Sequence, residues 1–324
     1  MAAFPSLSHG SHLSEAQEDK REENLTPGQR ITEYNDLIST LPHLLRKYHN
    51  FWIPEYQLPS IVIIQQHFKA RHSDVFLVSH PKSGTTWLKA LVFATINRTR
   101  YQFDNHPLLS RSPQDGVPCI EYDFAKDEAS KIEAMPSPRI LQSHYPYSPL
   151  SDSIKASDCR IIHVCRDAKD VLVSRWFFPN RMKRSNDMEP IQSGRAFEMF
   201  CEGICPYGPI WDHVLEYWEE SLRRPEKVLF MKYEEMLEEP IGNAKRLAEF
   251  MGCPFSLKEE KAGVVEEIVR LCSFEKLKNL EVNKANASIA PNIKLDHPTN
   301  SFRQRYLVAP SSYLLEQASC HQGN

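Results

Sequence analysis

The chain has 324 residues, of which 41% are hydrophobic, 25% charged and 10% aromatic, and its formal net charge at pH 7 is −3. This composition is that of a globular protein with a sizeable core, so a wholly disordered chain is excluded. A charge close to zero gives no bulk attraction to nucleic acid or to an acidic membrane. No apolar run approaches the roughly 18 residues of a membrane span. We therefore expect neither a nucleic-acid nor a membrane partner.

The N-terminal segment is expected to be a mostly disordered tail over residues 1–37. It mixes serine and histidine with the charge run Glu18 to Glu23, and it has neither the apolar core of a secretory signal nor the Arg-rich, acid-poor character of a transit peptide. These features predict a cytoplasmic protein. Its eight cysteines are then expected to be reduced thiols. Cys201 and Cys205 are spaced like helical metal ligands, but no second pair completes a set, so we predict core packing and no metal.

The segment 38–283 is expected to form one domain, because strand-like and helix-like stretches alternate along it. Short runs of β-forming residues are each followed by a turn and an apolar-periodic helical stretch. The expected strands are Asp74–Ser79, Arg139–His144, Arg160–Cys165 and Lys227–Lys232, and the helices that follow run from Thr86 to Asn97, from an Asp167 N-cap to Phe178, and from Glu234 to Phe250 with a stop at Gly252. An amphipathic helix is expected from Trp211. Such alternation predicts an α/β fold with a central parallel sheet flanked by helices, and ligands bind at the carboxyl ends of such strands.

The sharpest motif is Pro81-Lys-Ser-Gly-Thr-Thr-Trp-Leu-Lys89, which lies directly between an expected strand and an expected helix. A loop in this position points backbone N–H groups and the positive end of a helix at an anion. Gly84 permits close approach, the hydroxyls of Ser83, Thr85 and Thr86 can donate, and Lys82 adds a charge. This is phosphate-binding chemistry, but Lys82 precedes the glycine, so the loop is not a Walker A motif.

This loop resembles the phosphosulfate loop of the cytosolic sulfotransferases, which move a sulfonate from 3'-phosphoadenosine 5'-phosphosulfate (PAPS) to an acceptor hydroxyl or amine. Further segments resemble the plant branch of that family, and the resemblance extends from about Ile38 to Asn283. They are Cys201-Glu-Gly203, Gly208-Pro-Ile-Trp-Asp-His-Val-Leu-Glu-Tyr-Trp218, Lys227-Val-Leu-Phe230 and Leu271-Cys-Ser-Phe274.

The resemblance implies a P-loop-like sulfotransferase fold with PAPS as sulfonate donor and no metal. Lys82 to Trp87 would hold the 5'-phosphosulfate, with Trp87 stacking on the adenine, and Arg166 and Ser174 would bind the 3'-phosphate. The remaining adenine contacts would come from Tyr233, Cys272, Ser273 and Phe274. From the residues alone, core packing stays open for Trp87, Cys272 and Phe274, and an ion pair with Asp167 or Asp170 stays open for Arg166.

The catalytic group implied by the resemblance is His144, in a Ser143-His144 pair that matches the family's Thr-His motif. An imidazole with an unperturbed pKa of about 6.5 suits proton removal from an acceptor hydroxyl. Lys82 would act on the charge of the bridging oxygen. Gln142 stands where many animal members carry lysine, which predicts weaker charge stabilisation at that place.

The C-terminal segment 284–324 departs from the family pattern. The family's Arg-Lys-Gly and Gly-Asp-Trp sequences and its dimerisation motif are absent, and this region carries Arg303 and Arg305 but no glycine before Gly323. A shortened or frame-shifted product and a genuine lineage variant both fit, and the sequence predicts no oligomeric state.

Two functions follow from these features. The first is transfer of sulfonate to a hydroxyl of a phenolic, steroid or hydroxyjasmonate-type metabolite. The second is a catalytically compromised PAPS or PAP binder.

Overall fold

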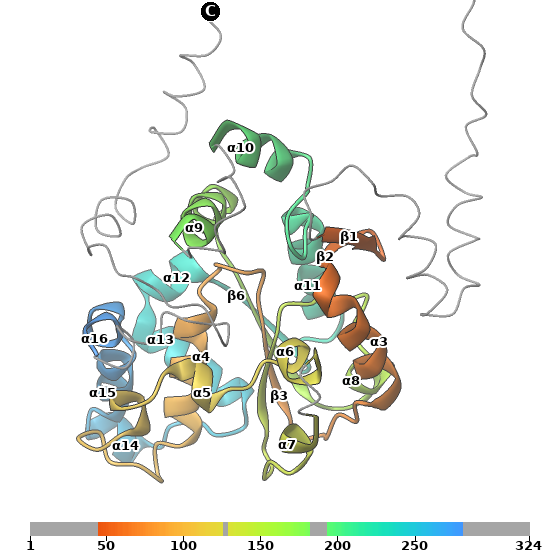
Figure 1. Ribbon diagram of the computed structural model, residues 1–324. Coiled ribbons are helices and arrows are strands. Elements are labelled where there is room, and N and C mark those ends of the chain that lie inside the picture. The colour runs from red at the N-terminus through yellow and green to blue at the C-terminus, as the bar shows by residue number, and fades with distance from the viewer. Residues whose placement is uncertain (1–44, 126–128, 182–192, 281–324) are drawn as a thin grey trace, which may run out of the picture.

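The computed structural model describes residues 45–125, 129–181 and 193–280. A four-stranded sheet lies at the centre of this part of the chain, with helices on both of its faces (Figure 1). The strands are β3 (Val75–Val78), β4 (Ile140–Ser143), β5 (Arg160–Cys165) and β6 (Val228–Lys232). Their order is β4-β3-β5-β6 and every pairing is parallel, as the sequence predicted.

Both faces of the sheet are buried because the strands are apolar at successive positions. Phe76, Val78 and Ile161 belong to one core cluster, whereas Leu77 and Ile162 belong to a second one on the opposite face. This alternation is the two-residue period of a strand. Residues of α3 (Leu58–His67) and α11 (Ile210–Arg223) join the first cluster. Residues of α4 (Thr85–Ile96), α13 (Pro240–Phe250) and α15 (Val264–Leu271) join the second.

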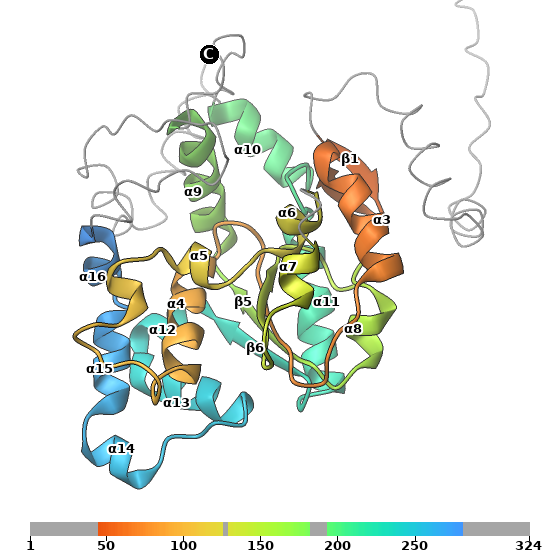
Figure 2. The ribbon, with the colours of Figure 1, turned by 60° about the horizontal axis from the view of Figure 1, so that its bottom comes forward.

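The remaining elements surround this three-layer core, as Figures 1 and 2 show. A two-stranded antiparallel hairpin of β1 (Leu45–Tyr48) and β2 (Phe51–Pro54), which the sequence analysis did not predict, lies on the α11 side. The other helices are η1 (Glu55–Gln57), η2 (Pro107–Leu109), α5 (Pro113–Gly116), α6 (Ile120–Ala125), α7 (Ala129–Glu133), α8 (Asp152–Ala156), α9 (Ala168–Arg181), α10 (Ser193–Cys201), α12 (Tyr233–Glu238), α14 (Leu257–Lys261) and α16 (Phe274–Asn279).

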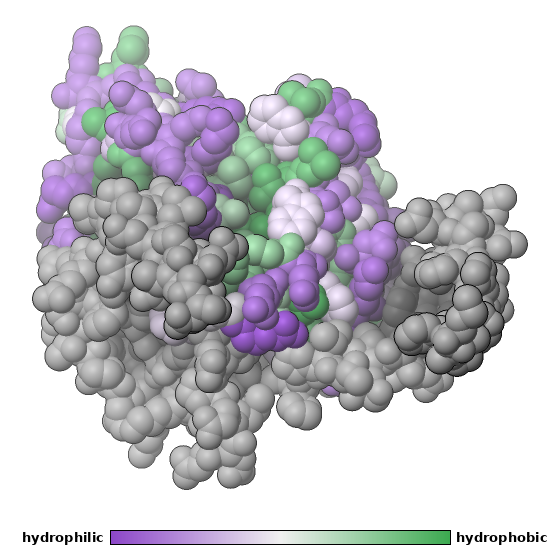
Figure 3. Space-filling model, turned by 90° about the horizontal axis from the view of Figure 1, so that it is seen from above, coloured by the Kyte–Doolittle hydropathy of each residue, from purple (hydrophilic) through white to green (hydrophobic). Residues whose placement is uncertain are grey.

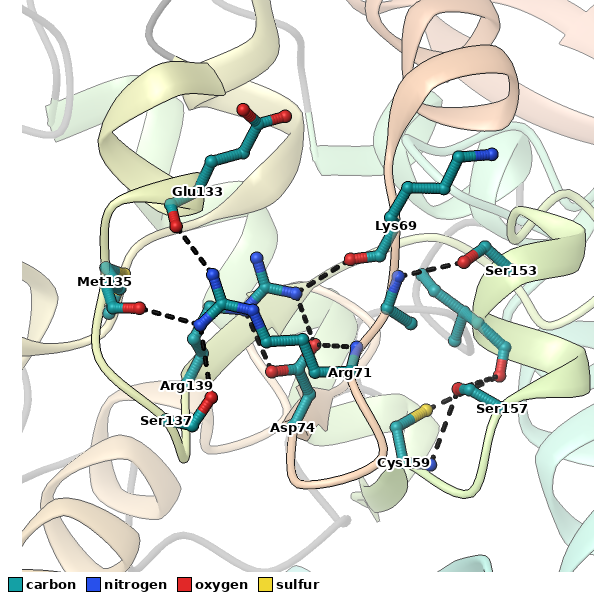
Figure 4. Close-up of polar contacts among 12 residues, drawn as sticks. Lys69, Arg71, Asp74, Glu133, Met135, Ser137, Arg139, Ser153, Ser157 and Cys159 are labelled. Carbon is teal, nitrogen blue, oxygen red and sulfur yellow. Dashed lines mark hydrogen bonds and ion pairs between the residues drawn. The ribbon is translucent and has the colours of Figure 1, made fainter.

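A buried ion pair joins the amino ends of the strands. The Arg139 guanidinium donates to both carboxylate oxygens of Asp74, at 2.9 and 2.5 Å, and to the carbonyl oxygen of Lys69 (Figure 4). The backbone N–H of Arg71 also donates to Asp74. Both side chains of the pair are essentially inaccessible to solvent, and a buried pair persists only when its remaining hydrogen bonds are satisfied in this way. The pair therefore fixes the edge of the sheet opposite to the carboxyl ends of the strands.

Most predicted elements are confirmed, and one is corrected. The helix predicted from Glu234 to Phe250 is two helices, α12 and α13, which break at Glu239. Pro240 causes the break, because proline lacks an N–H and disfavours a helical conformation in the residue before it. The predicted boundaries at residues 37 and 284 lie outside the described residues. Within the described ranges, no helix is long and apolar enough to cross a membrane.

Candidate active site

The parallel sheet brings four chain segments to one edge. The loop 79–84 follows β3, His144 follows β4, Arg166 follows β5 and Tyr233 follows β6. Val78 pairs with Ser143 and Cys165 pairs with Lys232, so the next residues of each pair are also neighbours. The register thus places Ser79 beside His144 and Arg166 beside Tyr233, at the carboxyl edge of the sheet. This edge is the place where open α/β sheets bind ligands.

The loop between β3 and α4 has an anion-binding backbone. Lys82 and Gly84 both have positive φ, of 76° and 100°, on either side of Ser83. No side chain caps the N-terminus of α4, which leaves the N–H groups of its first turn for a ligand. A Cβ on Gly84 would come within 2.5 Å of the Tyr233 ring, so only glycine fits between the loop and β6.

Two buried donors at this loop have no hydrogen-bond partner among the described residues. The Ser83 hydroxyl is inaccessible to solvent and makes no hydrogen bond, and neither does Nε of Arg166. The other guanidinium nitrogens of Arg166 donate to the Lys82 carbonyl at 3.5 Å and to the Asp170 carboxylate at 2.7 Å. A buried donor without an acceptor costs about 1–3 kcal/mol. These donors therefore fit an anionic ligand that accepts from the loop and from Arg166 together, although Asp170 also pairs with Arg166, as the sequence left open.

An aromatic wall borders the loop on the β6 side. The Trp87 and Tyr233 rings meet edge to face at 5.5 Å, and the Arg166 guanidinium lies 4.8 Å from the centre of the Tyr233 ring. Trp87 is only half-buried, so part of its ring stays accessible. A flat aromatic surface beside a phosphate loop suits a nucleotide base.

Lys89 supports the loop from within the protein, which the sequence analysis did not predict. Its ammonium group donates to Gln114 Oε1 at 2.6 Å and to the Val117 carbonyl at 3.0 Å. The Gln114 amide in turn donates to the hydroxyl of Thr86 at 2.9 Å. Burial lowers the pKa of Lys89, and acidic residues nearby oppose this shift. The chain of contacts thus fixes the Thr86 side chain.

His144 is joined to the phosphate loop through a single residue, Ser79. Nδ1 of His144 lies 2.7 Å from the Ser79 carbonyl oxygen, and the Ser79 hydroxyl lies 2.5 Å from the Thr85 hydroxyl. A carbonyl oxygen only accepts, so Nδ1 carries the proton and Nε2 holds a free lone pair. Burial lowers the pKa of His144 to about 3, which keeps the imidazole neutral at physiological pH. His144 therefore has the tautomer that a general base needs.

A set of aromatic rings lies next to His144. Its ring centre is 5.5 Å from that of Tyr207, which is itself 6.0 Å from Tyr145. The Tyr207 hydroxyl donates to the Gln57 side chain, and Tyr56 stacks with Tyr122. Seen from above, hydrophobic residues gather at the centre of the described part of this face, with hydrophilic residues on either side (Figure 3). The surroundings of His144 are suited to an apolar or aromatic acceptor.

The remaining predicted site residues lie on α9 and at the start of α16. Ser174 is half-buried, two turns along α9. Cys272 is fully buried in the core cluster against which Trp87 and Tyr233 pack, which favours the core-packing alternative for its thiol. The Ser273 hydroxyl accepts from the Lys276 N–H and so caps α16, whereas Phe274 is 41% exposed. The adenine role of these three residues stays a prediction.

The seven cysteines within residues 45–125, 129–181 and 193–280 are free thiols, and no group of three or more metal-ligating side chains occurs in those ranges. Cys205 is buried beside His80, at 3.6 Å from its Nε2, while Cys201 is exposed.

These features define a class of protein: an α/β protein with an anion-binding type of loop at the carboxyl edge of its sheet, next to a neutral histidine. The sequence profile of the sulfotransferase domain matches residues 72–309, a range that includes most of the C-terminal segment set apart above. The chain is 39% identical to cytosolic sulfotransferase 15 of Arabidopsis thaliana, over 79% of this chain and 75% of that protein. It is 42% identical to flavonol 3-sulfotransferase of Flaveria bidentis, over 77% and 82% of the two chains.

A solved structure shows the same fold. The crystal structure of a mouse sulfotransferase in complex with PAP superposes with a TM-score of 0.57 at 26% identity, and the match covers 83% of this chain and 87% of that one. The chain belongs to the sulfotransferase family, in its plant cytosolic branch, and it is a sulfonate-transferring enzyme. The predicted cytoplasmic location agrees with the names of the Arabidopsis relatives.

Proposed function

We propose that this protein transfers the sulfonate group of PAPS to a hydroxyl of a small phenolic metabolite of the flavonol type, with His144 as general base. The observation that carries the proposal is the position of Ser79, which contacts both the base and the loop. Its carbonyl holds His144 Nδ1 and its hydroxyl contacts Thr85. One residue thereby sets the position of the proton acceptor relative to the phosphate-binding loop.

The donor is held by residues of three strand ends. The loop from Lys82 to Trp87 receives the 5'-phosphosulfate. The Ser83 hydroxyl and Arg166 Nε, which have no partner in the part of the chain that the structure describes, donate to the ligand. Arg166 and Ser174 receive the 3'-phosphate. Trp87, Tyr233 and the segment Cys272 to Phe274 receive the adenine. PAP in the related mouse enzyme supports a nucleotide of this kind.

In the transfer step, Nε2 of His144 accepts the proton of the acceptor hydroxyl. The oxygen then attacks sulfur in line, and the bond between sulfur and the bridging phosphate oxygen breaks, so that PAP leaves with the electron pair. Lys82 stabilises the charge that develops on that oxygen. The negative charge of the bound donor raises the proton affinity of His144 from its low value in the free protein, which is the direction that base catalysis requires.

The acceptor class follows from the rings beside His144 and from the relatives. The rings of Tyr207 and Tyr145 pack beside His144 and make its surroundings aromatic and largely apolar. A relative at 42% identity is named a flavonol 3-sulfotransferase. A phenolic acceptor fits both observations.

The test is turnover with radiolabelled PAPS at saturating concentration and three acceptors: quercetin, 2-naphthol and a 3-hydroxysteroid. We expect sulfation of quercetin by the wild-type protein. His144→Asn is expected to lower kcat by at least about a hundredfold, the usual contribution of a general base, with PAP affinity unchanged within threefold. A His144→Asn variant with near-normal kcat would exclude His144 as the base. PAP binding without turnover of any of the three acceptors would favour the catalytically compromised binder instead.

A further inference from the structure

A buried carboxylate that the reaction does not use lies behind His144. Glu121, in the first turn of α6, has no solvent-accessible surface. Its carboxylate accepts hydrogen bonds from the Ser143 hydroxyl at 2.6 Å, from the Tyr145 N–H at 3.1 Å and from the His144 N–H. The Cys119 thiol donates to its second oxygen at 2.9 Å. One side chain therefore holds three consecutive residues at the end of β4.

The opposite side of the same segment is held by α11. Nε2 of His213 lies 3.1 Å from the His144 carbonyl oxygen, and the Tyr217 hydroxyl donates to the Tyr145 carbonyl at 2.9 Å. The N–H groups of residues 144 and 145 thus point to Glu121 and their carbonyls point to α11. With the backbone fixed from both sides, the His144 ring has little freedom beyond rotation about its own side-chain bonds.

The environment of Glu121 indicates that its carboxylate fixes the geometry of the groups that donate to it. Burial raises its pKa, and the hydrogen bonds from Cys119, Ser143 and His144 oppose that shift. The nearby ammonium group of Lys89 donates to Gln114 and Val117 rather than to Glu121. A buried carboxylate without an ion pair is costly and is retained where its hydrogen bonds determine a geometry.

We propose that Glu121 is a positioning residue for His144. It holds the turn after β4 so that Nδ1 stays on the Ser79 carbonyl and Nε2 faces the acceptor hydroxyl. This inference rests on the proposed role of His144 as base. Displacing a reacting group by about 1 Å can lower the rate about a hundredfold. The rate is therefore expected to depend on the length of the side chain that carries the carboxylate.

The decisive variant is Glu121→Asp, which keeps the charge but withdraws the carboxylate by one methylene from the N–H groups of residues 144 and 145. With the best of the three acceptors above, we expect kcat to fall at least tenfold while the Kd for PAP changes less than threefold. The matched control is Glu220→Asp, because Glu220 is also a buried glutamate and holds Arg223 and Arg224 instead of the β4 turn. The control is expected to keep kcat within twofold.

A second readout needs no acceptor. In protein labelled with ¹⁵N-histidine, the ring signals of His144, assigned by their loss in His144→Asn, are expected to shift or broaden in Glu121→Asp, whereas those of the core residue His163 stay in place. Unchanged His144 signals together with a kcat within twofold of wild type would overturn the proposal, and so would a loss of kcat matched by an equal loss of PAP affinity. If Glu121→Asp does not fold, Glu121→Gln is measured in the same way, with an expected fall in kcat of at least fivefold and with unchanged kcat and ring signals overturning the proposal.

Different results would reject the proposed function of His144 and the positioning role of Glu121. Normal turnover by His144→Asn removes the proposed function whatever Glu121 does. Unperturbed His144 signals in the Glu121 variant remove the positioning role even if His144 is the base.

Discussion

At the scale of single residues, the site contains polar groups whose hydrogen bonds are only partly satisfied within the described part of the protein. Ser83 and Arg166 each have a buried donor atom without an acceptor within residues 45–125, 129–181 and 193–280. His144 is held neutral with its free nitrogen on Nε2. Such features cost stability in the free protein and contribute only when a ligand or a reaction uses them.

The titration of His144 follows directly from its burial. Desolvation lowers its pKa to about 3, with Lys89, His213 and Arg175 acting in the same direction and the Ser79 carbonyl opposing them. We expect the ring of His144 in the free protein to stay neutral from pH 8 down to about pH 4, as measured by ¹⁵N-histidine NMR. Titration at the unperturbed value near 6.5 would show that the site is more hydrated than its burial implies.

Ser83→Ala separates stability from binding. The variant removes a buried hydroxyl without a partner, so we expect the free energy of unfolding to stay equal or to rise by up to about 1 kcal/mol. PAP affinity is expected to fall by about tenfold, since a charge-assisted hydrogen bond to phosphate is lost. Denaturant unfolding and calorimetry measure the two effects. Unchanged affinity would remove Ser83 from the phosphate site.

At the scale of elements, the site depends on the close contact between the loop before α4 and the residue after β6. Gly84 has a φ of 100° and leaves no space for a Cβ against Tyr233. The shape of the loop is therefore constrained by Tyr233, which follows a strand two positions away from β3 in the sheet. A change at Gly84 is transmitted to Tyr233 and to the Arg166 guanidinium that lies over its ring.

Gly84→Ala and Gly242→Ala form a matched pair. At Gly84 the added methyl meets Tyr233 and requires a left-handed backbone, so we expect PAP affinity to fall at least tenfold. At Gly242, within α13, the methyl meets nothing within 4 Å, and the protein is expected to gain about 0.5–1 kcal/mol of stability with unchanged PAP affinity. Equal PAP affinity in the two variants would show that the loop does not need its close approach to Tyr233.

At the scale of the whole molecule, desolvated histidines make the stability of the fold sensitive to acid. Burial is the largest cause of the lowered pKa of His80, His106, His144, His163 and His213. His163 stacks on the rings of Tyr217 and Phe230, and neither of its nitrogens has a hydrogen-bond partner among the residues that the structure describes. These groups are neutral in the folded protein.

The sign of the pH effect follows from these lowered values. As the pH falls below about 6.5, the histidines of the unfolded chain bind protons that those of the folded protein do not bind. The free energy of unfolding therefore decreases. For His213, with a pKa of about 4, the loss reaches about 3 kcal/mol once the pH has fallen to that value. The raised pKa of Glu121 and of Glu216 acts in the opposite direction.

We therefore expect urea-unfolding experiments to show a stability that is little affected by these histidines above pH 7 and that falls steadily between pH 6.5 and 5. His163→Phe is expected to reduce the slope of the unfolding free energy against pH by the equivalent of about one proton bound on unfolding. A stability that stays constant over that interval would contradict the buried, neutral state of the histidines.

The strands, helices and loop that carry the site could be predicted from the sequence, because each depends on residues that are close together in the chain. The runs Val75–Val78 and Arg160–Cys165 are strand-like by themselves, and the Asp167 N-cap is confirmed by its bond from the Lys169 N–H. The phosphate loop was recognisable because a parallel strand and a helix must be joined near a ligand-binding edge. The resemblance then predicted roles for His144 and Arg166, each of which directly follows a strand that ends beside the loop.

Other parts of the site could not be predicted, because they depend on contacts between distant segments. Glu121 has no motif of its own, and its importance appears only when α6 lies against the end of β4. The same holds for Lys89, whose buried ammonium reaches Thr86 through Gln114. The break could have been predicted from the presence of Pro240. Because the helical periodicity continues on both sides of this proline, one continuous helix was predicted instead.

The central claim is that the ends of β3, β5 and β6 assemble a PAPS site. Its most direct test is calorimetric titration of the purified protein with PAP, which needs no knowledge of the acceptor. We expect one site with micromolar affinity, weakened at least tenfold in Arg166→Met. A folded protein that shows no binding at millimolar PAP would contradict the assignment of the loop, Arg166 and Tyr233 to the nucleotide.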